Sequence, residues 1–303
     1  MAAPGDVKYF LEDYPMPEYR IITDSCCDLT MAQYEDLGVA YASLSVILDG
    51  ATYDSFSEPD QLQEFYRRLR TGEPVGTSGV NPNGWKQIMK PILEEGHDIL
   101  CIAFSSTLST TQQSARIAAH ELEEAYPQRT IRIVDSLAFS MGQGLLLMHA
   151  CRNRDNGLSL EENAAWCEDN KLHICHWLAV DGLDHLKKGG RVSRDTAFVG
   201  GMLRLKPILT ITDEGRFSAP DKVRGWKGAM DKIIRDFHTN AAGFDNSTVC
   251  IAHGDNPKAA AELADRFRKE CGVENVMINY VGGVLGAHLG PDTLSAFYMG
   301  SHR

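Results

Sequence analysis

The chain has 303 residues, a length that predicts two domains, each large enough to fold without disulfide or metal support. Its net charge is -11, and no block of Lys and Arg interrupts the acidic background. This charge excludes the usual nucleic-acid-binding classes and disfavours attachment to an anionic bilayer.

The eight cysteines are scattered, and none belongs to a Cys-x-x-Cys pair. Such spacing is typical of free, mostly buried thiols in a reducing compartment. Residues 1–19 lack the apolar segment of a signal peptide, and the apolar run at 144–148 is too short to cross a membrane. We therefore expect a cytoplasmic protein with no stable membrane insertion.

The first half alternates between predicted strands and helices. Residues 1–18, which contain three prolines, predict an irregular N-terminal extension. The expected strands are 19–23, 43–48, 97–104 and 130–134, and the expected helices are 59–69, 82–95, a segment ending near 126 and one starting at 141. Residues 76–79 are expected to form a loop. The alternation predicts a parallel sheet covered by helices on both faces.

The second half predicts a mixed α/β arrangement. The expected strands are 173–180, 207–212, 216–218, 249–252 and 276–280, and the expected helices are 160–171, 183–188, a segment after 225 and 257–269. A turn at 213–215 joins two of the strands, and residues 282–291 are expected to form a loop. We therefore predict two α/β domains, 19–171 with a parallel sheet and 172–303 with a mixed sheet.

Hydroxyl side chains gather where the predicted strands end. They occur as Asp-Ser at 24–25, Ser-Ser at 105–106 and Asp-Ser at 135–136, with Thr77 and Ser78 in a neighbouring loop. Ligands of open α/β sheets bind beyond the carboxyl ends of the strands, where hydroxyls can donate to an anion. Each of these residues taken singly has a second interpretation as a helix cap.

Arg191 and His288 are the other candidate binding residues. Arg191 follows two glycines, which permit close backbone approach to a carboxylate or phosphate, although a solvated helix end explains it equally well. His288 lies among four glycines and a proline, a sequence typical of a functional loop, unless local carbonyls satisfy the imidazole.

Several enzyme classes lack their motifs. The sequence contains no nucleophile elbow, no Walker phosphate loop and no Gly-x-Gly-x-x-Gly. His173, Cys175 and His176 do not predict a metal site, because alternate residues of a strand point to opposite faces. We interpret residues 141–148 as core.

Several ordered motifs resemble the DegV family, which includes the fatty-acid-binding subunits of bacterial fatty acid kinase. The resemblance covers about residues 19–300. Its landmarks are Thr23-Asp24-Ser25, Gly76-Thr77-Ser78, Ser-Ser-Thr-Leu-Ser at 105–109, Val134-Asp135-Ser136, Gly189-Gly190-Arg191, Lys206-Pro207-Ile208-Leu209, and Gly-Ala-His-Leu-Gly-Pro at 286–291. The family fold implies two α/β domains with an acyl chain between or within them, and we expect the ligand between the halves.

The resemblance implies a site that binds a long-chain fatty acid through its carboxylate. The residues it assigns are Thr77, Ser78, Ser105, Ser106, Arg191 and His288. It further implies a partner, a dihydroxyacetone-kinase-like fatty acid kinase that supplies ATP and magnesium. The chain itself would then have no catalytic residue, cofactor or metal, and would present the carboxylate for acyl phosphate formation.

Two alternatives stay open. Ser106 and His288 could serve a serine hydrolase or acyltransferase, which would turn over substrate without ATP. The chain could also be a lipid carrier or sensor without a kinase partner, in which case a kinase would not convert its bound lipid.

Overall fold

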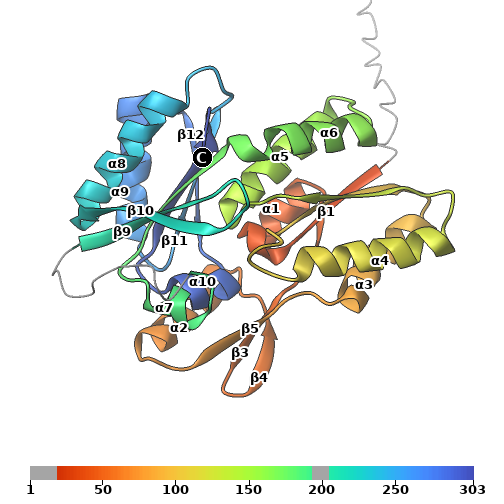
Figure 1. The fold of residues 1–303 in the computed structure, drawn as a ribbon, viewed down its shortest axis with the longest axis horizontal. Helices are drawn as coiled ribbons and strands as arrows, with labels where there is room; N and C mark the ends of the chain where they lie inside the picture. The colour runs from red at the N-terminus through yellow and green to blue at the C-terminus, as the bar shows by residue number, and fades with distance from the viewer. Residues whose placement is uncertain (1–18, 193–204) are drawn as a thin grey trace, which may run out of the picture.

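The computed structural model describes residues 19–192 and 205–303, so the predicted extension at 1–18 lies outside the described residues (Figure 1). The N-terminal part contains a parallel sheet and the C-terminal part a mixed sheet, which confirms the predicted fold class. The domain boundary at 171/172 stays a prediction. No helix of the described ranges is both long and apolar enough to cross a bilayer.

The first sheet is parallel throughout and runs in the order β2-β1-β6-β7. Its strands are β1 (Tyr19–Asp24), β2 (Ala40–Ala42), β6 (Asp98–Ala103) and β7 (Ile131–Asp135), with the short helices η1 (Ser25–Cys27) and α1 (Met31–Asp36) between the first two. The helices α3 (Pro82–Glu94) and α4 (Thr111–Ala125) cover one face, and α5 (Met141–Asp155) and α6 (Leu160–Asn170) cover the other (Figure 1). The alternation of strands and helices is therefore confirmed from β6 onward. The predicted strand at 43–48 does not belong to this sheet: it forms β3 (Ser45–Leu48) of a separate antiparallel sheet, and β2 pairs with β1 instead.

The second sheet has six strands in the order β10-β9-β8-β13-β11-β12, and only β11 and β12 are parallel. Its strands are β8 (Ile174–Ala179), β9 (Leu205–Ile211), β10 (Phe217–Arg224), β11 (Thr248–His253), β12 (Asn275–Tyr280) and β13 (Leu294–Met299), and η2 (Lys171–His173) precedes the first. Helices α8 (Gly225–Asn240) and α9 (Pro257–Cys271) pack on one face. Sequence analysis missed β13, because a short strand buried on both faces shows no polar alternation.

A third, antiparallel sheet places part of the candidate site. It runs in the order β4 (Ala51–Asp54), β3 (Ser45–Leu48), β5 (Val75–Ser78), and α2 (Pro59–Arg70) connects its outer strands. The prediction of a loop at 76–79 is wrong for its first three residues, because β5 pairs with β3 and sets Thr77 opposite Val46. A short, half-exposed strand containing glycine carries little strand signal of its own.

The glycine-rich segment at 282–291 is not the predicted loop. It forms helix α10 (Gly283–Leu289), which packs beside α7 (Asp184–Lys188) and α2. The glycines serve packing, since a Cβ on Gly286 would lie 2.5 Å from the Tyr66 hydroxyl. Glycine disfavours a helix by about 1 kcal/mol, but here the close approach of neighbouring aromatic rings overrides that preference.

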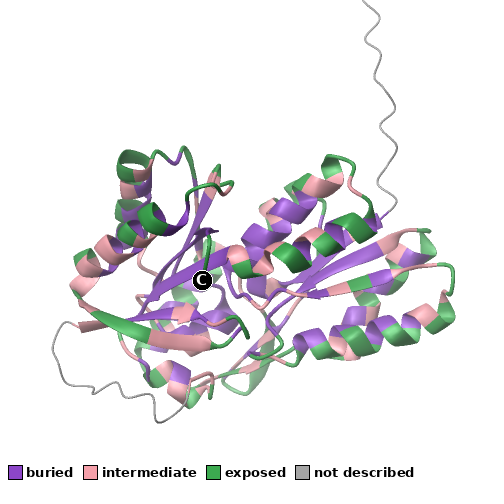
Figure 2. Cartoon of the chain, turned by 45° about the horizontal axis from the view of Figure 1, so that its top comes forward, coloured by how far each residue is buried: buried purple, intermediate pink, exposed green. Residues whose placement is uncertain are grey.

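Helix α5 lies between the two large sheets. It contacts β1 and β6 of the first sheet and β8, β11 and β13 of the second. Its first seven residues are all buried. Figure 2 colours buried residues purple, and the segments between the two sheets are largely purple. The interpretation of residues 141–148 as core is therefore confirmed, and one continuous apolar cluster joins the two halves.

Candidate binding site

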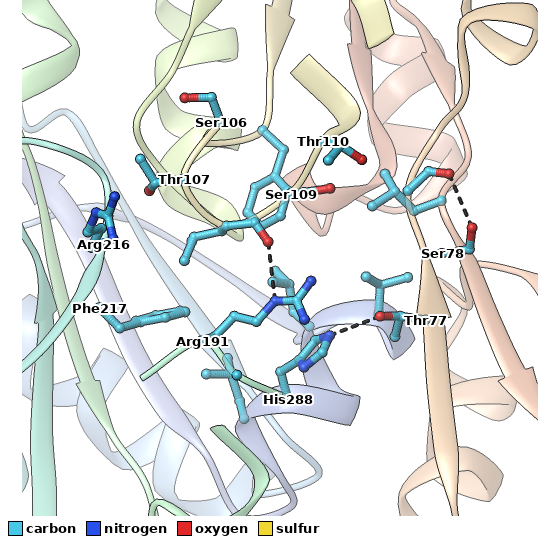
Figure 3. A pocket seen from close by; sticks show the side chains of 18 of the residues that line it. Thr77, Ser78, Ser106, Thr107, Ser109, Thr110, Arg191, Arg216, Phe217 and His288 are labelled. Carbon is cyan, nitrogen blue, oxygen red and sulfur yellow. Dashed lines mark hydrogen bonds between the residues drawn. The ribbon is translucent and has the colours of Figure 1, made fainter. Parts of the chain in front are cut away.

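A cavity of about 750 Å³ opens where the two halves meet (Figure 3). Its walls come from β5, the loop after β6, the segment after α7, the β9–β10 turn and α10. The apolar lining includes Leu44, Phe104, Leu108, Phe217, Leu285 and Leu289, and the polar lining includes hydroxyls, His288 and two arginines. Among the described residues, no Asp or Glu lines it, although the chain as a whole is acidic.

Thr77 and His288 form a direct contact across the cavity. The Thr77 hydroxyl on β5 lies 2.9 Å from Nε2 of His288 on α10. Burial, with smaller effects from the charges of Arg191 and His185, lowers the pKa of His288 to about 4, so the imidazole is neutral near pH 7. In the tautomer with a proton on Nε2, His288 donates to Thr77, and the hydroxyl proton is left to donate to a bound anion.

Gly189 fixes the other side of the imidazole. A Cβ at this position would lie 2.2 Å from Nδ1 of His288, so only glycine allows α7 to approach the ring this closely. The next residues turn the chain into the cavity, where Arg191 lies beside His288 in Figure 3. The paired glycines therefore have a packing role at the site as well as a turn role.

Arg191 is held by backbone carbonyls. Its Nε donates to the Leu108 carbonyl at 3.2 Å, and its Nη1 donates to the Gly189 carbonyl at 2.5 Å. In the part of the chain that the structure describes, it forms no ion pair with an acidic side chain. The guanidinium is thus oriented by neutral groups, and its charge is available to an anionic ligand.

The predicted serines occupy different environments. Ser106 and Ser78 line the cavity and are exposed, and the backbone N–H of Ser106 donates to Asp135 at 3.1 Å. Ser105 is fully buried outside the lining and donates to the Gly215 carbonyl at 2.9 Å. Ser106 therefore has the geometry for ligand contact, whereas Ser105 supports the β9–β10 turn.

The hydroxyls at the other strand ends do not reach the cavity. Ser25 accepts a hydrogen bond from the Leu44 N–H at 3.0 Å, and Ser136 accepts one from the Ala138 N–H at 3.2 Å. The alternative interpretation as helix caps does not apply to Thr77 or Ser106. Thr77 lies within a strand, and Ser106 caps no helix. Of the strand ends where hydroxyls were expected to meet a ligand, the loop after β6 is the one whose hydroxyls line the cavity.

A buried carboxyl group ties α10 to the N-terminal part. Asp28 accepts hydrogen bonds from the Ser140 hydroxyl at 2.5 Å and from the Gly282 N–H at the start of α10. Burial raises its pKa to about 7 despite these donors. Asp28 thus helps to set the position of the helix that carries His288.

The geometry does not assemble a nucleophile and base. The described contacts pair His288 with Thr77 rather than with Ser106, and no acid orients the imidazole. The described residues also contain no group of three or more potential metal ligands. The arrangement is suited to holding an anion in a cavity that also offers apolar side chains.

Sequence analysis missed Arg216, which lines the cavity beside Thr107. Its place follows from the docking of the Gly215 carbonyl onto the Ser105 and Thr107 hydroxyls, a contact between distant segments that local sequence does not show. The apolar lining residues carry no sequence signal that separates them from core.

Comparison with known proteins gives a consistent result. The protein-family model described as "Uncharacterised protein, DegV family" matches residues 18–301. A DegV domain-containing protein of Clostridium perfringens is 36% identical over 289 residues, covering 95% of this chain and 99% of the relative.

Two solved structures have the same fold. A DegV family protein from Thermus thermophilus, described for its fatty acid binding, superposes with a TM-score of 0.83 at 32% identity, covering 93% of this chain and 99% of that one. A DegV lipid binding protein from Thermotoga maritima gives 0.80 at 28% identity, with coverage of 94% and 99%. The chain therefore belongs to the DegV family.

Proposed function

We propose that this protein binds a long-chain fatty acid in the cavity and presents its carboxylate to a partner kinase. The observation that carries the proposal is a cavity lined by apolar side chains, hydroxyls and Arg191 but by no described carboxylate. Its volume of about 750 Å³ lies within the usual range of ligand sites. The fatty acid binding described for the Thermus thermophilus relative supports the ligand class.

The two ends of the ligand contribute differently to binding. Transfer of about 15 methylenes from water to the cavity contributes roughly 12 kcal/mol of favourable free energy. The loss of freedom on association costs about 4–15 kcal/mol and offsets much of that gain. The head group adds less energy but fixes the register, because Thr77 and Arg191 can donate only to the charged end. The carboxylate is then held on the side of the cavity that Thr77, His288 and Arg191 line.

We further propose a role in a kinase reaction, which the resemblance of the sequence motifs supports. The sequence contains candidate carboxylate-binding residues and no Walker phosphate loop. We propose that a dihydroxyacetone-kinase-like partner provides ATP and magnesium, and that this chain acts in the cytoplasm. Its eight free cysteines, seven of them buried, are consistent with a reducing compartment.

The first test is mass spectrometry of lipid released from the purified protein by denaturation. We expect long-chain fatty acid in a stoichiometric amount. In the second test, the loaded protein is mixed with a dihydroxyacetone-kinase-like partner, ATP and magnesium, and acyl phosphate is trapped with hydroxylamine. Bound fatty acid without acyl phosphate would favour the carrier or sensor, and ATP-independent turnover of an ester would favour the hydrolase.

A further inference from the structure

Arg216 brings a second guanidinium to the rim of the cavity. It lies just after the β9–β10 turn and is exposed, whereas Arg191 lies further along the wall toward Thr77 (Figure 3). It forms no ion pair with any acidic residue of the described segments. A solvated arginine is the ordinary explanation of an exposed guanidinium, so its position must be shown to be fixed.

The backbone beneath Arg216 is fixed to the loop after β6. The Gly215 carbonyl accepts hydrogen bonds from the Ser105 hydroxyl at 2.9 Å and from the Thr107 hydroxyl at 2.7 Å. Gly215 has a φ of +80° and no room for a Cβ, which would lie 2.4 Å from the Ser105 oxygen. The turn packs closely against this loop and places Arg216 next to Thr107 in Figure 3, while Ser106 lines the same cavity.

Two carboxylates near Arg216, those of Asp135 and Glu214, interact with other donors. Asp135 accepts the backbone N–H groups of Ser106 and Leu137, at 3.1 and 3.3 Å. Hydrogen bonds from the Thr212 hydroxyl and from backbone, more than the charge of Arg216, lower the pKa of Glu214. Neither carboxylate neutralises the Arg216 guanidinium by direct contact, so the positive charge faces the rim.

A fatty acid alone does not account for two guanidinium groups. Its carboxylate carries one negative charge, which Arg191 and the Thr77 hydroxyl can match, while the neutral His288 adds none. The phosphoryl group of an acyl phosphate carries close to two negative charges near pH 7, and its three terminal oxygens can accept hydrogen bonds. A phosphoryl group arriving from a partner would also reach the rim before any deeper part of the cavity.

We propose that Arg216 and the Ser106 hydroxyl form a phosphoryl subsite that holds the head group of an acyl phosphate. The inference rests on the proposed function and names the state of the ligand that Arg216 recognises. In the transfer, a carboxylate oxygen bonds to the γ-phosphorus of the partner's ATP, the bond to the β–γ bridging oxygen breaks, and ADP leaves with that electron pair. The new phosphate dianion then lies beside Arg216.

The test needs no kinase. The affinities of the wild type for palmitate and for hexadecyl phosphate, a stable phosphate monoester of equal chain length, are compared with those of Arg216→Gln. We expect the substitution to weaken hexadecyl phosphate binding about five- to tenfold, since an exposed guanidinium is partly screened, and to change palmitate binding less than about twofold. Lys222→Gln, which removes an equal charge from an exposed position of β10, should change neither.

Three outcomes would overturn the subsite. Hexadecyl phosphate affinity could be unchanged in Arg216→Gln, could fall equally for both ligands, or could fall as much in Lys222→Gln. In each case wild-type binding of palmitate would leave the proposed fatty acid function standing. If the wild type binds neither ligand, the proposed function itself fails, and thermal unfolding of each variant confirms that the comparison is made on folded protein.

Discussion

The contact between Thr77 and His288 joins residues 211 positions apart. Neither residue forms it because of its local sequence: Thr77 belongs to a short edge strand, and His288 to a glycine-rich helix. The contact places a hydroxyl and a neutral imidazole in a cavity that both polar and apolar side chains line. A carboxylate placed there keeps its hydrogen bonds when it leaves water, which is the condition for burying a charge.

Thr77→Val is predicted to lower fatty acid affinity with little change in the melting temperature of the lipid-free protein. The substitution keeps the shape of the side chain and removes the hydroxyl that donates to the carboxylate, a loss of about tenfold in affinity. Fatty acid titration and thermal unfolding of the same variant measure both quantities. Thr52→Val, at an exposed position of the same small sheet, is the matched control. Unchanged affinity in Thr77→Val would remove this hydroxyl from the site.

At the scale of elements, the site depends on how closely helices α7 and α10 approach. Gly189 ends α7 where His288 of α10 packs against it, and Gly286 allows α10 to approach Tyr66 of α2. A sequence rich in glycine was interpreted as a loop because its local preference opposes a helix. The segment forms helix α10 instead, because the packing of that helix against α2 needs a glycine at position 286.

Gly189→Ala is predicted to move His288 and weaken fatty acid binding. Alanine suits the backbone here, with a φ of -74°, so the effect comes from the clash of its Cβ with the imidazole. Overpacking of this kind costs about 1–3 kcal/mol of stability. Thermal unfolding and fatty acid titration are compared with those of Gly182→Ala, a nearby glycine with no heavy atom within 4 Å of the added Cβ. Indistinguishable behaviour of the two variants would contradict the proposed contact.

At the scale of the whole molecule, α5 makes the two halves share a core. One apolar cluster includes Ile22 of the first sheet, Leu146 of α5 and Phe297 of the second sheet. A second apolar cluster, on the face of the second sheet that α8 and α9 cover, belongs to the C-terminal half alone. The cavity lies at the same junction, so its shape depends on both halves being folded.

Chemical unfolding is predicted to show one cooperative transition. Loss of either sheet would expose α5, whose first seven residues are all buried. Far-UV circular dichroism and tryptophan fluorescence should give coincident curves, since Trp85 and Trp166 report on the first half and Trp177 and Trp226 on the second. Two separated transitions would instead support independent folding of 19–171 and 172–303.

Local sequence was enough to predict the α/β class, the parallel sheet of the first half and the segments around Thr77, Ser106, Arg191 and His288 that line the cavity. These features follow from local signals: apolar runs, helix starts, and glycines or hydroxyls in ordered motifs. The role of the four residues in holding a carboxylate stays a prediction, although the structure places them around one cavity.

Other features depend on contacts between distant segments: the choice of the hydroxyl that faces the cavity, the helix at 283–289, the place of β13 inside the second sheet and the position of Arg216 at the rim. Ser105 and Ser106 are identical in type and adjacent, and only the docking of Gly215 onto one of them separates their roles. Local sequence sets the backbone preference of each segment. Residues distant in the chain decide how strands pair, how closely glycines approach aromatic rings and where a side chain points.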